Sequence, residues 1–372
     1  MTPKQRIISA IKGYPVDRVP VATYNFHPFE IKGTASFSRE PAYRPMLNAI
    51  SKTSIGIICK VPIKYEGEIK GRIRTEHKIL ENATLTITYL NTPKGELRSI
   101  VSKPKTQPAY QVEPFIKEDR DLEKYLSLSN EPLTPDLSIA KDVYKRLGDK
   151  GVVYVSYEDP LFTVSRLFKF EDFVVKCMQQ FSLIKALVDR EFRRIKIQLK
   201  RVLEEAKNYD FLFYSAGPEI ATPPMLPPQI FQKLVTPYHY ELGKMIREAG
   251  HLHSIHCHGK VKAVFDQFLE IGNNVLEPLE PPPQGDITLK DALNKAKGRM
   301  CLMGYIQDQD LYTFTPVEIR TKVRSICQLV KGKTGYIMTT TATPYMFPPP
   351  QRFVRNYVEF VKAAEEYGSN ES

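Results

Sequence analysis

The sequence has few cysteines and no long apolar run. Its five cysteines are scattered without paired spacing, at Cys59, Cys177, Cys257, Cys301 and Cys327. A dispersed, odd-numbered set in a chain of 372 residues favours reduced thiols over a disulfide framework. No stretch approaches the roughly 20 apolar residues that span a bilayer, and the segment from Met1 to Arg6 leads into a short amphipathic run rather than a secretory signal. We therefore expect a cytoplasmic protein that neither enters nor crosses a membrane.

Several common catalytic and binding motifs are also missing. The sequence contains no glycine-rich phosphate loop, no nucleophile elbow and no paired CxxC site. The net charge of +11 is spread along the chain, in segments such as Arg190 to Arg201, instead of forming a basic tail. With no nucleic-acid-binding module, the charge does not predict a nucleic-acid partner, although it is compatible with an anionic ligand.

What the sequence does contain is an alternation of short β-rich runs with longer helical ones. Helical pattern follows most of these runs, for example from about Val164 to Ala206 and from Pro227 to Ala249. Such alternation is typical of parallel βαβ units, and eight strands are the number that closes a (β/α)₈ barrel. The eight expected strands are Val19–Ala22, Ile55–Ile58, Val152–Val155, Phe211–Tyr214, Leu252–Cys257, Asn274–Leu276, Met300–Met303 and Tyr336–Thr339.

A different pattern interrupts the first third of the chain. The runs Arg72–Lys78, Thr84–Tyr89 and Glu96–Val101 are typical of short antiparallel strands joined by turns. We interpret residues of about 70–102 as a small β insertion, so that residues 1–372 form one (β/α)₈ barrel domain. An open, doubly wound α/β sheet is the structural alternative.

Three proline clusters each follow a predicted strand, at 223–228, 281–283 and 348–350. Proline cannot continue a hydrogen-bonded ladder and it stiffens a loop. Because the loops after the strands form the catalytic face of a barrel, these clusters would hold active-site loops in place.

The most unusual segment is a histidine cluster. Four of the seven histidines lie between His251 and His258. Alternate strand residues share a face, so His256 and His258 are expected to point one way and Cys257 the other. Two imidazoles at the end of a strand make half of a zinc site and can act in acid–base chemistry. The alternative is a polar strand end whose histidines bond only to backbone.

A third metal ligand must come from a neighbouring loop. Glu219 follows the strand before the histidines, and Glu277 and Glu280 follow the strand after them. We predict Glu219 or Glu277 as the ligand, each weighed against an ordinary solvated or capping carboxylate. Cys301 lies within an apolar run and is interpreted as part of the core.

Other polar residues are expected at the same rim, because each follows a predicted strand. We predict that they line a substrate pocket. They are Tyr157, Glu158, Tyr305, Asp308, Thr341 and Thr343.

These segments together resemble the uroporphyrinogen decarboxylase superfamily, which also contains cobalamin-dependent methyltransferases. The resemblance begins at Asp17–Val21 and Thr92–Leu97, becomes dense from Gly217 to Met225, and includes His256–Gly259 and Glu277–Glu280. Further matching segments are Pro228–Phe231, Thr236–Tyr238, Gly285–Asp286, Cys301–Gly304 and Arg355–Tyr357. The resemblance covers nearly the whole chain and implies a (β/α)₈ barrel independently of the strand count.

The chain departs from both main branches of that superfamily. The decarboxylases carry an arginine-rich stretch after the first strand, whereas residues 23–30 here contain no arginine. The methyltransferases bind zinc through His-x-Cys and a later cysteine. Here His256 stands at the histidine position, His258 replaces the first cysteine, and Ala342 or a neighbouring threonine replaces the second. The resemblance thus implies a zinc site rich in nitrogen and oxygen, with His256, His258 and a glutamate as ligands.

Such a site favours Lewis-acid action on an oxygen over activation of a thiol. The leading hypothesis is methyl transfer, with His256, His258 and Glu219 as catalytic residues, from a small methylated or methoxylated donor to a corrinoid carried by a partner protein. The alternatives are a tetrapyrrole decarboxylase and a non-catalytic binder of a corrinoid or other anionic cofactor. We expect a monomer or a homodimer.

Overall fold

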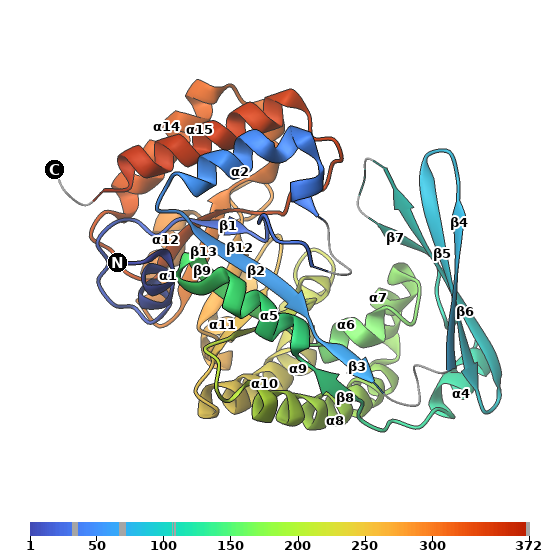
Figure 1. Ribbon diagram of the computed structural model, residues 1–372. Helices are drawn as coiled ribbons and strands as arrows, with labels where there is room; N and C mark the ends of the chain where they lie inside the picture. Colours follow the sequence, from blue (N-terminus) through green and yellow to red (C-terminus); the bar gives the residue numbers. More distant parts are fainter. Residues whose placement is uncertain (32–35, 67–71, 106, 108, 370–372) are drawn as a thin grey trace.

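Eight parallel strands form one continuous sheet in the computed structural model, which describes residues 1–31, 36–66, 72–105, 107 and 109–369 (Figure 1). Their order along the sheet follows their order in the chain, as expected for a barrel. The strands are β1 (Ala22–Tyr24), β2 (Gly56–Pro62), β9 (Gly151–Ser156), β10 (Leu212–Ala216), β11 (Leu252–His256), β12 (Val275–Leu279), β13 (Cys301–Ile306) and β14 (Tyr336–Thr340).

The first and last strands of this sheet meet. Val21 forms a parallel bridge with Met338, and the Met338 N–H donates to the Pro20 carbonyl at 2.8 Å. The sheet therefore closes into a (β/α)₈ barrel, which confirms the predicted fold, and the open-sheet alternative is wrong. All eight expected strands are present, although β1 begins three residues later than predicted, at Ala22 instead of Val19.

Helices follow the strands and surround the barrel (Figure 1). The run expected to be helical from about Val164 to Ala206 is divided among three helices, because the chain turns between them. The α-helices are α1 (Pro3–Ile11), α2 (Arg44–Ser51), α4 (Asp119–Leu126), α5 (Ser138–Leu147), α6 (Pro160–Ser165), α7 (Phe170–Gln179), α8 (Phe181–Ala206), α9 (Pro228–Leu234), α10 (Thr236–Glu248), α11 (Phe265–Ile271), α12 (Leu289–Ala296), α13 (Asp308–Thr313), α14 (Pro316–Val330) and α15 (Gln351–Tyr367). Short 3₁₀ turns are η1 (Phe37–Arg39), η2 (Pro41–Tyr43), η3 (Gly148–Lys150), η4 (Pro218–Ala221) and η5 (Lys262–Val264). None of the described helices combines the length and the apolarity needed to cross a membrane.

A four-stranded antiparallel sheet stands beside the barrel, near α7 (Figure 1). It consists of β4 (Ile73–Ile79), β5 (Ala83–Thr92), β6 (Gly95–Pro104) and β7 (Tyr110–Glu113). This confirms the predicted β insertion and extends it beyond residue 102, because β7 pairs with β6. A further pair, β3 (Lys64–Glu66) with β8 (Thr134–Asp136), was not predicted. The assignment of residues 1–372 to one domain stays a prediction.

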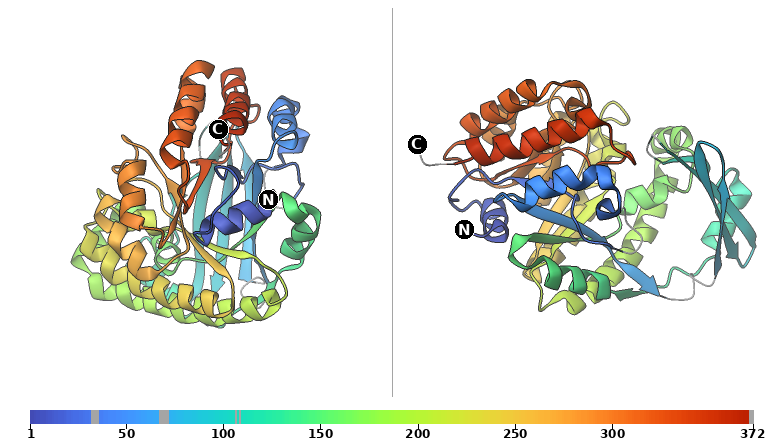
Figure 2. Two further views of the ribbon diagram at one scale, coloured as in Figure 1. Left: turned by 90° about the vertical axis from the view of Figure 1, so that its left-hand side faces the viewer. Right: turned by 45° about the horizontal axis from the view of Figure 1, so that its top comes forward.

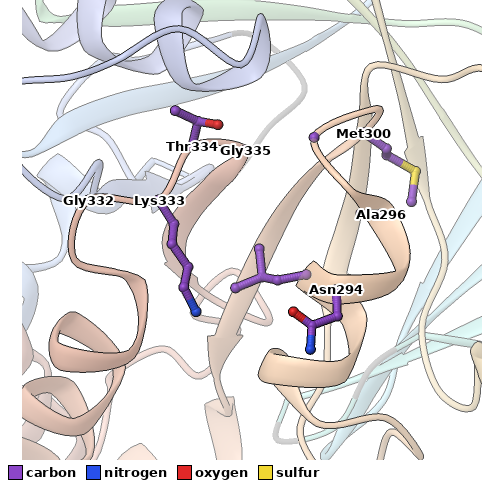
Figure 3. Close-up of a pocket in the computed structure, with 9 residues that line it drawn as sticks. Asn294, Ala296, Met300, Gly332, Lys333, Thr334 and Gly335 are labelled. Atoms are coloured by element: carbon purple, nitrogen blue, oxygen red, sulfur yellow. The ribbon is translucent and has the colours of Figure 1, made fainter.

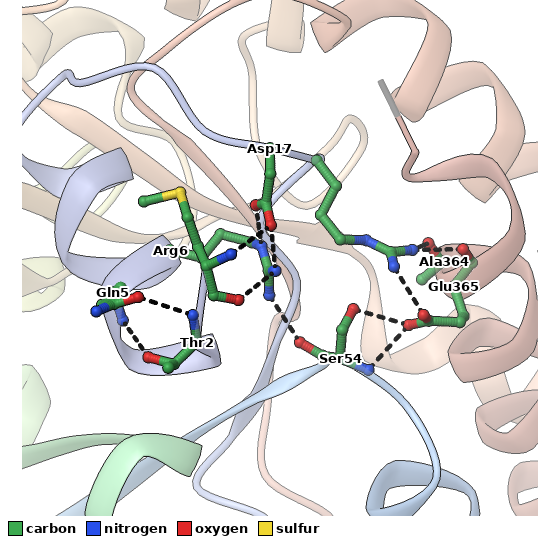
Figure 4. Close-up of polar contacts among 9 residues, drawn as sticks. Thr2, Gln5, Arg6, Asp17, Ser54, Ala364 and Glu365 are labelled. Atoms are coloured by element: carbon green, nitrogen blue, oxygen red, sulfur yellow. Dashed lines mark hydrogen bonds and ion pairs between the residues drawn. The ribbon is translucent and has the colours of Figure 1, made fainter. Parts of the chain in front are cut away.

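The amino-terminal end of the barrel is closed by α1 (Figure 2). A capping box between Thr2 and Gln5 begins this helix, and Ile7, Ala10 and Ile11 pack with the apolar side chains inside the barrel. Paired charges surround it (Figure 4): Arg6 binds the Asp17 carboxylate at 2.7 and 2.8 Å, and Arg18 binds Glu365 at 2.7 Å. The amino-terminal end of the barrel is thus filled by apolar side chains, and the charged side chains around it are paired with charges of opposite sign.

The carboxyl ends of the strands form the opposite face. The proline clusters at 223–228, 281–283 and 348–350 follow β10, β12 and β14, so each lies in a loop of this face as predicted. Cys257, directly after β11, packs in the apolar layer between the sheet and the helices, whereas Leu252 of β11 packs inside the barrel. The alternation predicted for this strand therefore places Ser254 and His256 on the inner side.

Candidate functional site

The barrel interior changes from apolar to polar toward the carboxyl ends of its strands. At the centre of this polar layer is Lys60 of β2, whose ammonium lies 3.9 Å from the ring centroid of Tyr24 and 3.8 Å from that of Tyr214. The Lys60 ammonium also lies 3.5 Å from Oε2 of Glu277, and Ser254 donates a hydrogen bond to Oε1 of Glu277 at 3.1 Å. Side chains from five strands, β1, β2, β10, β11 and β12, thus surround or form one buried ion pair.

Burial governs the charges of this pair. It lowers the pKa of Lys60 to about 8, against the attraction of Glu277, and it raises the pKa of Glu277, against the attraction of Lys60. Each charge therefore depends on the other, since an unpaired charge in such a position is costly.

His256 contacts the same two tyrosine rings that lie against Lys60. Its Nδ1 is hydrogen-bonded to the Tyr24 hydroxyl at 2.6 Å, and its ring meets that of Tyr214 edge-on at 5.6 Å between centroids. Burial, followed by the positive charges of Lys60 and His258, holds the pKa of His256 well below its usual value. The imidazole is therefore neutral at pH 7, with one nitrogen that donates a hydrogen bond and one that accepts.

His258 lies at the edge of the site. Its ring meets that of His256 edge-on at 4.5 Å between centroids, and its Nδ1 is 3.4 Å from Oε2 of Glu280. The same carboxylate accepts a hydrogen bond from the Gly259 N–H at 2.7 Å, and another from the side chain of Gln307 at 3.3 Å. Burial acts to raise the pKa of Glu280, but its bonds to His258 and Gly259 outweigh that effect and leave it lowered. Glu280 is therefore an ionised anchor for the loop that carries His258.

Glu219 faces a cavity that it shares with His258. This cavity has a volume of about 300 Å³, and its wall includes both side chains. One Glu219 oxygen accepts a hydrogen bond from the Gly217 N–H at 3.1 Å. Burial raises the pKa of Glu219, against its backbone hydrogen bonds and the charge of His258, so the carboxyl group retains a proton more readily than an exposed glutamate.

The residues predicted to bind metal are therefore only partly brought together. His256 contacts His258, and His258 shares a cavity with Glu219, but Glu277 lies deeper, where it is bonded to Lys60 and Ser254. Within the described part of the chain, no group of three or more His, Cys, Asp or Glu side chains is arranged to hold a metal ion. The zinc site stays a prediction.

Three of the residues predicted to line a substrate pocket are held by other contacts. The Tyr157 hydroxyl is hydrogen-bonded to Nε2 of His253 at 2.6 Å, in the layer outside the barrel. Glu158 forms an ion pair with Arg194 of α8. The Tyr305 hydroxyl accepts a hydrogen bond from the backbone N–H of residue 289, at the start of α12, at 3.0 Å.

The other three lie near β14. Thr341 accepts a hydrogen bond from the Asp308 N–H at 3.0 Å, and Thr343 donates one to the Tyr24 carbonyl at 3.2 Å. Asp308 is 2% exposed, its Oδ1 has no hydrogen-bond partner among the described residues, and burial raises its pKa to about 7. None of these six side chains is part of the wall of the cavity that contains Glu219.

Sequence reasoning missed the residues inside the barrel. Lys60 carried a usable signal, because it is the one charged residue in the apolar run Ile57–Val61. Buried charges are rare unless they are paired or functional. Tyr24 and Tyr214 gave no such signal, because a tyrosine in a β-rich run is ordinary.

A second cavity, of about 320 Å³, lies at the opposite end of the barrel (Figure 3). Its wall includes Met300 and Gly335, the residues just before β13 and β14, together with Asn294 and Lys333. It is therefore remote from the histidines, at the face where barrel loops usually serve stability.

Comparisons with known proteins agree with this fold. A methyltransferase from Methanosarcina mazei superimposes with a TM-score of 0.61 at 15% sequence identity, covering 99% of both chains. A B12-independent methionine synthase from Shewanella sp. W3-18-1, in complex with selenomethionine, gives a TM-score of 0.49 at 9% identity, covering 94% of this chain and 97% of that one. At these identities the likeness to the Methanosarcina protein concerns the fold alone.

Sequence comparisons give a more specific result. A search of curated proteins finds no match. Residues 98–367, well over half of the chain, match the uroporphyrinogen decarboxylase (URO-D) family. That range contains both histidines and all the carboxylates of the site described above. The chain therefore belongs to the uroporphyrinogen decarboxylase family.

Proposed function

We propose that this protein is a methyltransferase that moves a methyl group from a small methylated or methoxylated donor to a corrinoid carried by a partner protein. The observation that carries the proposal is the cavity of about 300 Å³ in which Glu219 and His258 meet at the carboxyl ends of the strands. Its size fits a compact donor, and its glutamate can hold a proton.

The charges around the site argue against a porphyrinogen substrate. Among the carboxyl groups at the carboxyl ends of the strands, that of Glu280 is ionised, and residues 23–30 supply no arginine. The Lys60 ammonium is already paired with Glu277. A substrate with eight carboxylates would therefore leave charges of the same sign close together and unpaired, which is unfavourable.

The residues of the cavity suggest how a methoxy donor could react. When the bond between the methyl carbon and the oxygen breaks, its electron pair remains on the oxygen, which must gain a proton to leave as a hydroxyl. Glu219 faces the cavity, and burial raises its pKa, so it would act as the general acid. The corrinoid supplies the electron pair that forms the new bond to the methyl group.

The neutral His256 has a positioning role in this scheme. The Tyr24 hydroxyl fixes the plane of its ring, and the ring in turn contacts His258 at the cavity wall. Lys60 lies against both tyrosine rings that flank His256, and so holds the floor of the site in one arrangement.

Zinc is a separate part of the proposal. His256 and His258 supply two nitrogen atoms, but His256 Nδ1 is bonded to Tyr24, and a third ligand is not in place among the described side chains. The present arrangement does not fit a preformed site, so no step is derived through the metal. Metal analysis of the purified protein and of a His256→Ala/His258→Ala variant tests it: zinc at one equivalent, lost in the variant, supports the site, and its absence from the wild type removes it.

The function itself is tested by direct transfer. The protein is incubated without oxygen with a reduced corrinoid and a series of methylated donors, and the corrinoid spectrum is recorded. A change that requires both donor and protein supports the proposal. Family membership keeps tetrapyrrole decarboxylation as the second candidate, and conversion of uroporphyrinogen to coproporphyrinogen, with no methyl transfer from any donor, would establish that candidate instead.

A further inference from the structure

The cavity that contains Glu219 and His258 has two unlike walls. The polar wall carries the carboxyl group and the imidazole, with Lys260 at its exposed rim. Other parts of the wall are formed by apolar side chains, among them Phe170, Ile220 and Met225. Such a combination, a mostly apolar wall with few polar groups, is the usual composition of a small-molecule site.

Two of the apolar side chains are partly exposed. The exposed fractions of Phe170 and Met225 are 38% and 47%. They come from separate parts of the chain, since Phe170 begins α7 whereas Met225 lies in the loop after β10. Two large apolar side chains that remain partly exposed and meet at one cavity indicate a surface that an apolar ligand covers.

The size of the cavity limits that ligand. A volume of about 300 Å³ lies at the lower end of the range for ligand sites and accommodates a single ring with small substituents. Among the described residues, its wall holds one phenylalanine, Phe170, and no tyrosine or tryptophan, so it is not the cage of several such rings that recognises a methylated ammonium group.

We propose that this cavity binds an aromatic methyl ether with a single ring, whose ring contacts Phe170 and Met225 and whose ether oxygen faces Glu219 and His258. This inference rests on the proposed methyl transfer and names its donor class. The methyl–oxygen bond breaks, the methyl group passes to the corrinoid with the electron pair that the corrinoid supplies, and the oxygen keeps the electron pair of the broken bond and leaves, once protonated, as a phenol.

The test is a binding measurement that needs no turnover. Isothermal titration with methoxybenzene, methanol and tetramethylammonium compares the wild type with Phe170→Ala, Met225→Ala and Met178→Ala. Met178 is the matched control, because it is 56% exposed on α7 but lies outside the wall of this cavity. Methoxybenzene is expected to bind most tightly, and the first two variants to weaken it about tenfold each, as for loss of one good apolar contact, with Met178→Ala unchanged.

Two outcomes would overturn the inference: tighter binding of methanol or tetramethylammonium than of methoxybenzene, or equal affinity for methoxybenzene in all four proteins. Thermal unfolding of each variant confirms that it is folded. Failure of the inference is distinguishable from failure of the proposed function. Methyl transfer from another donor without binding of methoxybenzene refutes only the inference, whereas binding of methoxybenzene without transfer from any donor refutes the function and the donor role and leaves only the binding site for an aromatic ring.

Discussion

The two ends of this barrel are built from similar residues but differ in how their charges are satisfied. At the amino-terminal end, Arg6 is paired with Asp17 and Arg18 with Glu365, and Ser54 also donates to Glu365 at 2.9 Å. At the carboxyl end, burial raises the pKa of both Glu219 and Asp308. Charges at the first end are paired, whereas at the second end burial makes two carboxyl groups harder to ionise.

This difference shows what marks the reactive face. Both ends contain carboxylates, so composition alone does not separate them. What separates them is that the carboxyl end buries ionisable groups without full compensation, which costs stability and is a common property of functional sites. Of the substitutions below, those at the carboxyl end are expected to change activity or to change stability strongly, and the one at the amino-terminal end to change stability only slightly.

The largest effect is expected for His256→Ala. It removes the imidazole that contacts His258 and bonds to Tyr24, so we expect a loss of about a hundredfold in kcat per folded molecule, within the usual range for a positioned imidazole. Steady-state methyl transfer measures it. Tyr24→Phe, which deletes only the hydroxyl bonded to Nδ1, should lose less, and an unchanged kcat in His256→Ala would show that the ring plays no part.

The next effect concerns stability. Lys60→Met leaves Glu277 buried without its ion-pair partner, and we expect a loss of about 3–5 kcal/mol in the free energy of unfolding. Urea denaturation at pH 7 measures it. Lys60→Met/Glu277→Met, which removes both charges, should be markedly more stable than the single variant. If the double variant is as unstable as the single one, the unpaired charge of Glu277 is not the cause of the lost stability.

Asp308→Asn is expected to stabilise the protein at high pH. The pKa of Asp308 is raised from 3.8 to about 7, so the folded protein keeps a proton that the unfolded chain loses, and wild-type stability falls between about pH 4 and pH 7. At pH 8 the variant should gain up to about 4 kcal/mol over the wild type, because one pKa unit corresponds to about 1.4 kcal/mol. Unfolding measured at pH 4 and pH 8 tests this, and an equal difference at both values contradicts it.

The smallest effect is expected at the amino-terminal end. Arg6→Met removes the partner of Asp17, whose side chain is 40% exposed, so solvent screening limits the loss to about 1–2 kcal/mol. The paired Arg6 lowers the pKa of Asp17, so this contribution is present above about pH 4, the unfolded value, and is lost as the pH falls through the lower folded pKa. Methyl transfer per folded molecule should be unchanged. A loss of kcat would contradict the claim that the amino-terminal end contributes to stability alone.

The architecture could be predicted because it depends on local patterns. The run Val152–Val155 is buried on both faces, which is the pattern of a parallel strand. Because the sequence contains eight runs of this kind, it predicted a (β/α)₈ barrel. The exact start of β1 could not be predicted, because Pro20 and Val21 reach β14 through only one backbone hydrogen bond and one bridge.

The site was predictable only where residues adjacent in sequence act together. His256 and His258 are two positions apart, so the period of a strand placed them on one side. The neighbourhood of Glu219, in contrast, depends on Phe170 and Met225, which lie tens of residues apart from each other. Likewise, Lys60 and Glu277 are brought together only by closure of the barrel, so no local pattern could pair them.

The central claim is that Glu219 gives a proton to the leaving oxygen. Its most direct test is whether the loss of methyl-transfer rate in Glu219→Gln depends on the leaving group. Rates of methyl transfer would be compared for the wild type and the variant with donors whose leaving oxygens range from strongly to weakly basic. If Glu219 supplies the proton, the variant should be about a hundredfold slower with the most basic leaving oxygen and nearly equal to the wild type with the least basic. An equal loss across the whole series would contradict the account.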